Sequence, residues 1–290
     1  MTIQLIIDNV QVPVKHIKFS DGSSNVKLEI PEQLVKYPPS AYYAITVETT
    51  TPADNYLWEI LLVQNAVRKT FMGTVFKKKI LRLPYLPHAR ADRVFEVGNA
   101  LPLEIFLDEI LGFTDISLTD PHSDFYLDIK DLVEFSVKSQ HECFIETVRG
   151  IQSGDVLISP DKGALSKIYK LQLALDHRTI ATTVIEASKK RDVATGRIIE
   201  TTLPEGIDLS GKVVYIVDDI GDGLATFIPL AEKLKEVGAK EVHLYVTHMI
   251  AAKGLNLLKG KIDQLHVYQT VGTYITQTDV LNFNLGKEVK

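Results

Sequence analysis

The sequence predicts an α/β protein with two similar halves, each a parallel sheet flanked by helices. Runs typical of strands alternate with runs of helical spacing through most of the chain, which is the pattern of repeated βα units. The same alternation begins again after residues 138–150, where the periodicity is weakest. In addition, the apolar run 213–217 ends in acidic residues, as a buried parallel strand does when its carboxyl end meets a ligand.

The expected elements can be followed in order. In the first half they are a strand at 41–50, a helix at 55–69, a strand at 77–85, a helix at 99–113 broken near its start by Pro102, and a short strand at 115–120. In the second half they are a strand at 155–161, a helix at 162–175, a strand at 178–187, a strand at 212–219, a helix at 225–238 and a strand at 241–249. Gly238 is a suitable residue to end the last of these helices.

Length and composition agree with a folded two-domain chain. The 290 residues fit two domains of ordinary size, and 45% hydrophobic with 24% charged residues is typical of globular proteins. We expect an N-terminal domain at 1–140 and a C-terminal domain at 141–274, with 275–290 as a segment that can join the first.

Charge and cysteine content exclude several classes of protein. The formal net charge of −5 argues against a partner that is nucleic acid or an anionic membrane, because both require a basic face. The single cysteine, Cys143, cannot form an internal disulfide and suits a reducing compartment. The first ten residues carry no cationic leader, and no apolar run is long enough to span a bilayer. We therefore expect a cytoplasmic location.

The acids after the apolar run form the most informative motif. Asp218, Asp219 and Asp222 lie within five residues, and hydrated neighbouring carboxylates repel by about 1 kcal/mol, so a cation or hydroxyl groups are expected nearby. The next segment, DGLAT at 222–226, precedes a helix, whose free backbone N–H groups can hold a phosphate. The alternative is a solvated turn in which Asp222 or Thr226 caps the helix. Taken together, these features suit a ribose with its phosphate, and no P-loop motif is present.

The motif and several others in order resemble the ribose-phosphate pyrophosphokinase family, the phosphoribosyl diphosphate (PRPP) synthetases, whose loop is close to VDDIIDTGGT. The other family-like segments are FSDGS (19–23), TTTPADNYLWEILL (49–62), PYLPHARADR (84–93), LTDPHSDF (118–125), ISPDKG (158–163) and KKR (189–191). The resemblance implies two domains of the type I phosphoribosyltransferase fold. It also implies transfer of the β,γ-diphosphoryl group of ATP to the anomeric 1-hydroxyl of ribose 5-phosphate, with Mg²⁺ as cofactor and ATP as co-substrate.

The same resemblance assigns roles to residues. The expected ribose-phosphate-binding residues are Asp218, Asp219, Asp222, Gly223, Leu224, Ala225 and Thr226. The expected ATP-binding residues are Phe19, Asp21, Arg90, Asp92 and Arg93. The expected metal-binding residues are Asp120, His122 and Asp161, and the expected catalytic residues are Lys189, Arg191 and His122, with Lys190 as the alternative lysine.

Two of these groups have a simpler explanation in the sequence alone. Arg90 and Arg93 around Asp92 suit the oxygens of a polyphosphate, but they also suit a surface ion-pair cluster. Asp120 and His122 would point to the same side only if the backbone stays extended after the strand.

Phe19 and Asp21 correspond to family residues that contact ATP bound to a neighbouring subunit. The resemblance therefore implies a homo-oligomer, built from dimers and extending to a hexamer, with an ATP site at a subunit interface. The first domain would carry ATP binding and oligomerisation, and the second would bind the ribose phosphate.

The chain departs from the family pattern at several positions. Ser23, Ala91 and Pro121 replace the usual residues, and the loop reads DGLAT in place of DTGGT. The loop change suggests an acceptor larger than ribose 5-phosphate, such as ADP-ribose, in nucleotide or NAD synthesis. Two alternatives stay open at this point. They are a phosphoribosyltransferase that consumes PRPP, and a non-catalytic subunit that regulates a synthetase.

Overall fold

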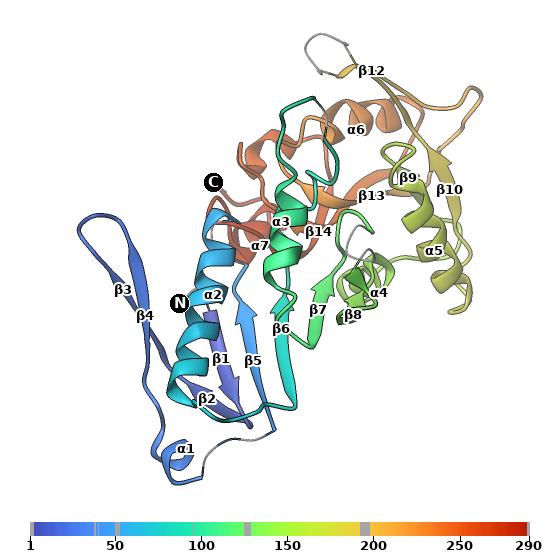
Figure 1. Cartoon of the computed structure of the whole chain (residues 1–290). Coiled ribbons are helices and arrows are strands. Elements are labelled where there is room, and N and C mark those ends of the chain that lie inside the picture. The colour runs from blue at the N-terminus through green and yellow to red at the C-terminus, as the bar shows by residue number, and fades with distance from the viewer. Residues whose placement is uncertain are drawn as a thin grey trace. The chain divides into compact units, whose positions relative to one another are not determined.

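The computed structural model describes residues 3–37, 39, 41–49, 53–94, 96–124, 129–191 and 198–288. For residues 53–55, 189–191 and 198–200 it describes the backbone alone. The chain forms two compact units, residues 1–138 and 139–290. Each unit contains a sheet with helices packed on it, so the predicted α/β class with parallel sheets is confirmed (Figure 1).

The first unit is built on a six-stranded sheet of order β2-β1-β5-β6-β7-β8. Its strands are β1 (Ile3–Ile7), β2 (Val10–Val12), β5 (Tyr42–Val47), β6 (Lys78–Leu83), β7 (Asp115–Thr119) and β8 (Glu134–Lys138). Strands β5 to β8 are parallel, whereas β1 pairs antiparallel with both β2 and β5. Asp8 and Asn9 join β1 to β2 with φ of 43° and 66°, which suits a two-residue hairpin turn.

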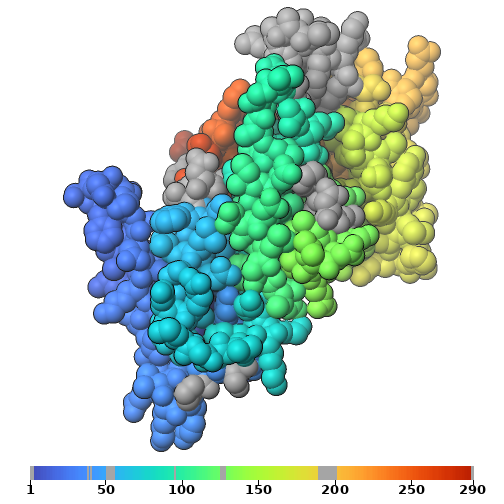
Figure 2. Space-filling model, in the orientation of Figure 1, coloured from blue at the N-terminus to red at the C-terminus, as the bar shows by residue number. Residues whose placement is uncertain are grey.

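Three helices and a second hairpin complete this unit. The helices are α1 (Glu32–Lys36), α2 (Ala53–Thr70) and α3 (Pro102–Glu109), and the hairpin consists of β3 (Val14–Lys18) and β4 (Ser24–Leu28). Helix α2 buries Tyr56, Ile60, Val63 and Val67, whose spacing of three to four residues places them on one face. In the space-filling view, α2 and α3 cover the visible face of the first sheet (Figure 2).

The predicted helix at 99–113 is shorter in the structure. Pro102 lies at the first position of α3, where its missing N–H costs nothing, so the proline begins the helix instead of breaking it.

The second unit is built on a five-stranded sheet of order β10-β9-β13-β14-β15, parallel throughout. Its strands are β9 (Val156–Ser159), β10 (Thr183–Glu186), β13 (Val213–Gly221), β14 (Glu241–Met249) and β15 (Gln264–Thr270). A separate antiparallel ribbon consists of β11 (Ser188–Arg191) and β12 (Ile198–Thr202). The helices are α4 (Gln140–Thr147), α5 (Leu165–Asp176), α6 (Phe227–Glu236), the 3₁₀ helix η2 (Leu255–Leu258) and α7 (Gln277–Asn284).

The sequence of β13 is apolar from Val213 to Val217 because helices cover both faces of the sheet at this strand. Val214 and Ile216 pack in a core cluster with α6 and α7, whereas Tyr215 and Val217 pack in a second cluster with α4 and α5. Successive side chains of a strand point to opposite faces, and both faces are covered here. The apolar run therefore ends shortly before the strand does, because Asp218 and Asp219 belong to the last four residues of β13.

Two local features differ from the sequence prediction. Residues 138–150 contain helix α4, which begins at a capping box where Glu142 accepts a hydrogen bond from the backbone N–H of Ser139. The strand predicted at 178–187 begins only at Thr183, because Thr179 has φ of 62° and the backbone turns after α5. Among the helices that the structure describes, none combines the length and apolar character needed to cross a bilayer.

Candidate functional site

The predicted acids lie at the carboxyl edge of the second sheet. Asp218 and Asp219 are within the last four residues of β13, and Asp219 is buried with an exposed fraction of 6%. The backbone N–H of Asp219 donates to Asp218 Oδ1 at 2.9 Å, which restrains the Asp218 carboxylate. Because all five strands are parallel, the loops that follow them meet at this edge, where ligands of open α/β sheets bind.

A lysine that was not among the predicted site residues forms an ion pair with Asp219. Lys167 Nζ is 3.1 Å from Asp219 Oδ2, and the side chains are 26% and 9% exposed. The lysine comes from the first turn of α5, which follows β9 next to β13 in the sheet. A buried carboxylate is stable as an ion only when it is paired, so Lys167 favours the charged form of Asp219.

The loop at 222–226 turns sharply between β13 and α6. Leu224 has φ of 60°, a backbone conformation in which glycine is favoured, and its side chain is buried in the core cluster beside α6. Such strain costs about 1–3 kcal/mol and persists where the surroundings impose it, often at functional sites. The change from a family glycine to Leu224 is therefore compatible with a tight turn.

Space remains over this loop. A methyl group placed on Gly223 would meet no atom within 4 Å, and Ala225 is exposed. Gly221, by contrast, is closely packed, because a methyl group there would lie 2.7 Å from Met249 Sδ. The carbonyl of Gly221 also accepts hydrogen bonds from the N–H groups of Ile250 and Ala251, which fixes the start of the loop.

Helix α6 directs its amino terminus at the loop. Thr226 precedes the first helical residue, the first turn carries no acid, and Lys233 and Lys235 lie in the last turn. The partial positive charge of the helix start is therefore not neutralised by a side chain of that turn. This arrangement can bind an anion such as a phosphate.

Asp161 has a structural role that is visible in the fold. Its Oδ1 accepts hydrogen bonds from the N–H groups of Gly163 and Ala164 at 3.0 and 3.2 Å, and Ser159 Oγ donates to the carbonyl of Asp161 at 2.7 Å. These bonds shape the turn between β9 and α5. This turn leads into the first turn of α5, where Lys167 lies. Asp161 therefore contributes to the site by fixing the backbone that carries Lys167.

In the first unit, Asp120 and His122 follow the end of β7. The two side chains were expected to point to the same side only if the backbone stayed extended. Asp120 has φ of 35°, so the backbone is not extended there. Asp120 is 2% exposed, whereas His122 is exposed. The N–H of Asp120 donates to the carbonyl of Lys138 at 2.8 Å, which ties this turn to the end of β8.

The basic segment at 90–93 is at the surface of the same unit. Arg90 is exposed, and Arg93 is 74% exposed on its side chain, with Nε 3.4 Å from Asp92 Oδ1. The N–H of Ala91 donates to the carbonyl of His88 at 2.8 Å in a turn where His88 has φ of 61°. The ion pair that the sequence allowed is thus formed, and the guanidinium groups are accessible.

Phe19 and Asp21 lie at the tip of the β3–β4 hairpin, which extends beyond the first sheet in Figure 1. Phe19 is 50% exposed. Asp21 Oδ1 accepts hydrogen bonds from Oγ and N–H of Ser23 at 2.7 and 2.9 Å, and these bonds hold the pKa of Asp21 below its usual value. Ser23, the residue that departs from the family pattern, therefore orients Asp21.

The side chains of Lys189, Lys190 and Arg191 lie outside the described part of the structure. Their backbone belongs to β11, which pairs with β12 and changes register between Lys190 and Arg191. Among the described side chains, no group of three or more His, Cys, Asp or Glu is close enough to hold a metal ion.

Comparison with known proteins connects these features. Residues 142–274 match the family model of the phosphoribosyl transferase domain. The chain is 28% identical to a ribose-phosphate pyrophosphokinase of Pyrococcus furiosus, covering 95% of this chain and 90% of the relative. It is 29% identical to a ribose-phosphate pyrophosphokinase of Sulfurisphaera tokodaii, covering 84% of this chain and 79% of the relative. The resemblance inferred from the sequence is therefore confirmed.

A solved structure supports the fold. The crystal structure of phosphoribosylpyrophosphate synthetase from Mycobacterium smegmatis matches with a TM-score of 0.62 at 18% identity, covering 89% of this chain and 80% of that chain.

Proposed function

We propose that this relative of the ribose-phosphate pyrophosphokinases is a diphosphokinase-type transferase. It moves the β,γ-diphosphoryl group of ATP to the anomeric 1-hydroxyl of ribose 5-phosphate and releases AMP. The names of the relatives support this class of reaction. The single observation that carries the proposal is the edge of the second sheet, where two carboxylates, a paired lysine and a helix amino terminus occur together.

The second unit binds the sugar phosphate. Asp218 and Asp219 accept hydrogen bonds from the ribose 2- and 3-hydroxyls, since an ionised carboxylate is an acceptor only. The 5-phosphate lies against the backbone N–H groups at 222–226, with Asp222 and the Thr226 hydroxyl as further contacts. The open space over Gly223 supports this location.

The first unit binds ATP. Arg90 and Arg93, both exposed, contact the phosphate oxygens, and Asp92 holds Arg93. Phe19 and Asp21 contact the adenine of ATP bound to a neighbouring subunit, which makes the enzyme a homo-oligomer. The support for this step is the half-exposed aromatic ring at the tip of an extended hairpin.

Magnesium fits the donor set of these residues. Mg²⁺ commonly takes one or two protein ligands and completes its shell with water and substrate phosphates, so a cluster of three side chains is not required. Asp120 and His122 are the residues of the first unit that would hold it, and Asp161 is the candidate ligand of the second unit. When bound, the ion neutralises the charge of the polyphosphate.

Transfer itself requires alignment and charge neutralisation more than covalent help from the protein. The sugar hydroxyl attacks the β-phosphorus, and negative charge develops on the oxygen that leaves with AMP. We assign Lys189 and Arg191 to this charge, with His122 close to the metal. Closure of the β11–β12 ribbon would bring these cations over the reacting groups.

The acceptor is a separate question within this function. Leu224 and Ala225 replace residues of a glycine-rich loop, and a phosphodiester requires fewer donors than a terminal phosphate. We therefore include ADP-ribose as an acceptor, with a product used in nucleotide or NAD synthesis.

The experiment is an assay of AMP formation by the purified protein with Mg-ATP and either ribose 5-phosphate or ADP-ribose. AMP formed only in the presence of an acceptor supports the transferase. Turnover of ribose 5-phosphate but not of ADP-ribose contradicts the proposal that ADP-ribose is an acceptor. Absence of AMP with both acceptors contradicts the function and favours a regulatory subunit, and consumption of PRPP with a nucleobase indicates a phosphoribosyltransferase.

A further inference from the structure

A cavity lies at the opposite edge of the second sheet from the proposed active site. It has a volume of about 680 Å³ and opens among the turns that precede β9, β13 and β14. Lys212 at this edge and Asp219 at the other are seven residues apart, and a strand rises about 3.3 Å per residue, so about 23 Å separates them. The cavity is therefore distinct from the sugar site. Its lining residues carry a set of charges that the proposed reaction does not use.

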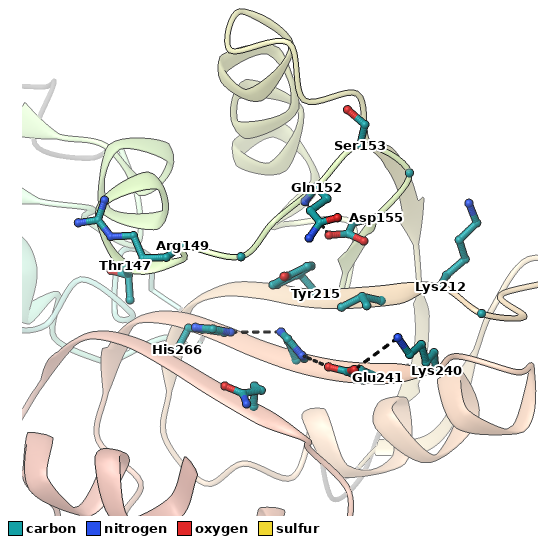
Figure 3. Close-up of a pocket in the computed structure, with 16 residues that line it drawn as sticks. Thr147, Arg149, Gln152, Ser153, Asp155, Lys212, Tyr215, Lys240, Glu241 and His266 are labelled. Atoms are coloured by element: carbon teal, nitrogen blue, oxygen red, sulfur yellow. Dashed lines mark hydrogen bonds and ion pairs between the residues drawn. The ribbon is translucent and has the colours of Figure 1, made fainter. Parts of the chain in front are cut away.

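Three cations come to the cavity from three different turns. Arg149 follows α4, Lys212 precedes β13 and Lys240 precedes β14, and all three belong to the cavity lining (Figure 3). In the described part of the chain, no carboxylate lies within ion-pair distance of Arg149 or Lys212. Lys240 Nζ is 3.9 Å from Glu241 Oε1, which is a weak contact. Three cations from separate turns give this edge of the second sheet a basic lining, which can attract an anion.

The two acids of the lining are already bound to other groups. Asp155 Oδ2 accepts a hydrogen bond from the N–H of Gln152 at 2.8 Å, which closes the turn before β9. Glu241 Oε2 is 3.0 Å from His243 Nε2. Each of these carboxylates therefore already has a hydrogen-bond partner, and the two negative charges offset only part of the positive charge of the three cations.

The floor contains a chain of titratable groups. His243 Nδ1 is 3.2 Å from His266 Nε2, so Glu241, His243 and His266 form a continuous hydrogen-bonded series (Figure 3). Because an ionised Glu241 only accepts, His243 carries its proton on Nε2, and in a neutral pair its Nδ1 accepts from His266 Nε2. His266 Nδ1 is then the position at which a further proton can bind.

This series is held rigidly by packing. The Tyr215 ring lies edge-on to His243 with centroids 4.8 Å apart, and His243 is 8% exposed. Burial, and then the charge of His243, lower the pKa of His266 to about 4. Tyr215 is itself held neutral, because burial and the nearby Asp155 and Glu241 raise its pKa to about 12. At neutral pH, His266 is therefore uncharged.

We propose that this cavity binds the phosphate monoester of a small metabolite, and that the imidazole pair takes up a proton when the anion binds. A volume of several hundred Å³ is suitable for a molecule of nucleotide size, whereas a bare inorganic anion would occupy only a small part of it. A dianion bound at the cations of this lining favours the charged form of His266 and so opposes the effect of burial on its pKa. The other charged or titratable groups that face the pair are Asp155, Tyr215 and Glu241.

The test uses the imidazole NMR signals of His243 and His266 in the full-length protein, assigned with His243→Gln and His266→Gln variants. The probes are AMP, adenosine as a neutral control, and sulfate, which stays a dianion from about pH 5.5 to about pH 8. The proposal predicts that AMP and sulfate shift both signals, that adenosine does not, and that sulfate binds more tightly at the lower pH. The two signals report on the cavity directly, because His243 and His266 both belong to its lining.

A matched pair of variants gives the second part of the test. Lys212→Ala combined with Lys240→Ala should weaken binding of AMP at least tenfold, whereas Lys170→Ala on the exposed side of α5 should leave it unchanged. Absence of any shift with AMP, or an unchanged affinity in the double variant, overturns the proposal. Binding of sulfate without AMP overturns the assignment to a phosphate ester.

Discussion

Lys167 Nζ lies 3.1 Å from Asp219 Oδ2, so a helix that follows β9 supplies the cation for a carboxylate at the end of β13. The pair connects two neighbouring parallel strands at the edge where the sugar is proposed to bind. Its function follows from burial, because Asp219 could not remain ionised at this depth without a partner. We therefore regard Lys167 as a positioning residue for Asp219, the acid that is proposed to bind the sugar.

Replacing this lysine tests that role. Lys167→Met should destabilise the protein by about 1–3 kcal/mol, because a partly buried carboxylate loses its partner. It should also raise the KM for ribose 5-phosphate about tenfold with a smaller change in kcat. The control is Lys170→Met, one turn further along α5 and exposed. Equal KM values in the two variants would show that the ion pair is structural only.

Gly223→Ala separates binding from stability. A methyl group there meets no protein atom within 4 Å, so the free energy of unfolding should change by less than about 0.5 kcal/mol. If the acceptor phosphate occupies that space, its KM should rise about tenfold. Gly150→Ala is the control, because Gly150 also has open space around it but belongs to the other edge of the sheet. Unchanged KM in Gly223→Ala would move the phosphate away from this loop.

Phe19→Ala tests the hairpin tip. The ring is 50% exposed, so its removal should leave the melting temperature nearly unchanged. The KM for ATP should rise several-fold if, as proposed, the Phe19 ring contacts the adenine of ATP bound to a neighbouring subunit. Tyr37→Ala, at an exposed aromatic residue after α1, should leave the KM for ATP unchanged. A loss of stability without a change in KM would contradict the assigned role.

The stability of the second unit should depend on pH through His266. Its pKa is lowered to about 4 in the folded state from 6.5, so the unfolded chain binds a proton first as the pH falls. The stabilisation is therefore complete above about pH 6.5 and is lost toward about pH 4, by an amount on the order of 2–3 kcal/mol. Urea unfolding across this range measures it, and His266→Gln should flatten the dependence. A wild-type stability that rises as the pH falls would have the wrong sign.

Sequence reasoning predicted the central parallel strands of both sheets, because their signals are local, but it did not predict β1, β2, β8 or β15. The run 213–217 is apolar because both faces of β13 are covered, and the acids that follow mark the edge of the sheet. Helix α4 was missed although its S-x-x-E capping box, Ser139 to Glu142, was present in the sequence. A search for helix starts in the weakly patterned stretch would have found it.

The features of the sites that the sequence did not indicate depend on contacts between distant residues or on the conformation of the backbone. Lys167 and Asp219 are 52 positions apart, and no local pattern indicates that they meet. The backbone turns at Asp120, where φ is 35°, so Asp120 is buried whereas His122 is exposed. The sequence does not indicate this turn, because a positive φ is expected mainly at glycine. The cavity lined by Arg149, Lys212 and Lys240 likewise depends on three turns that only the fold brings together.

The most direct measurement is the affinity for ribose 5-phosphate, and the turnover with Mg-ATP, of Asp219→Asn. This change keeps the size of the side chain and removes the charge that is proposed to accept hydrogen bonds from the sugar. We expect affinity and kcat/KM to fall about 100-fold, equivalent to about 2.7 kcal/mol, in a protein that remains folded. Binding and turnover equal to those of the unmodified protein would contradict a sugar site at this edge of the sheet.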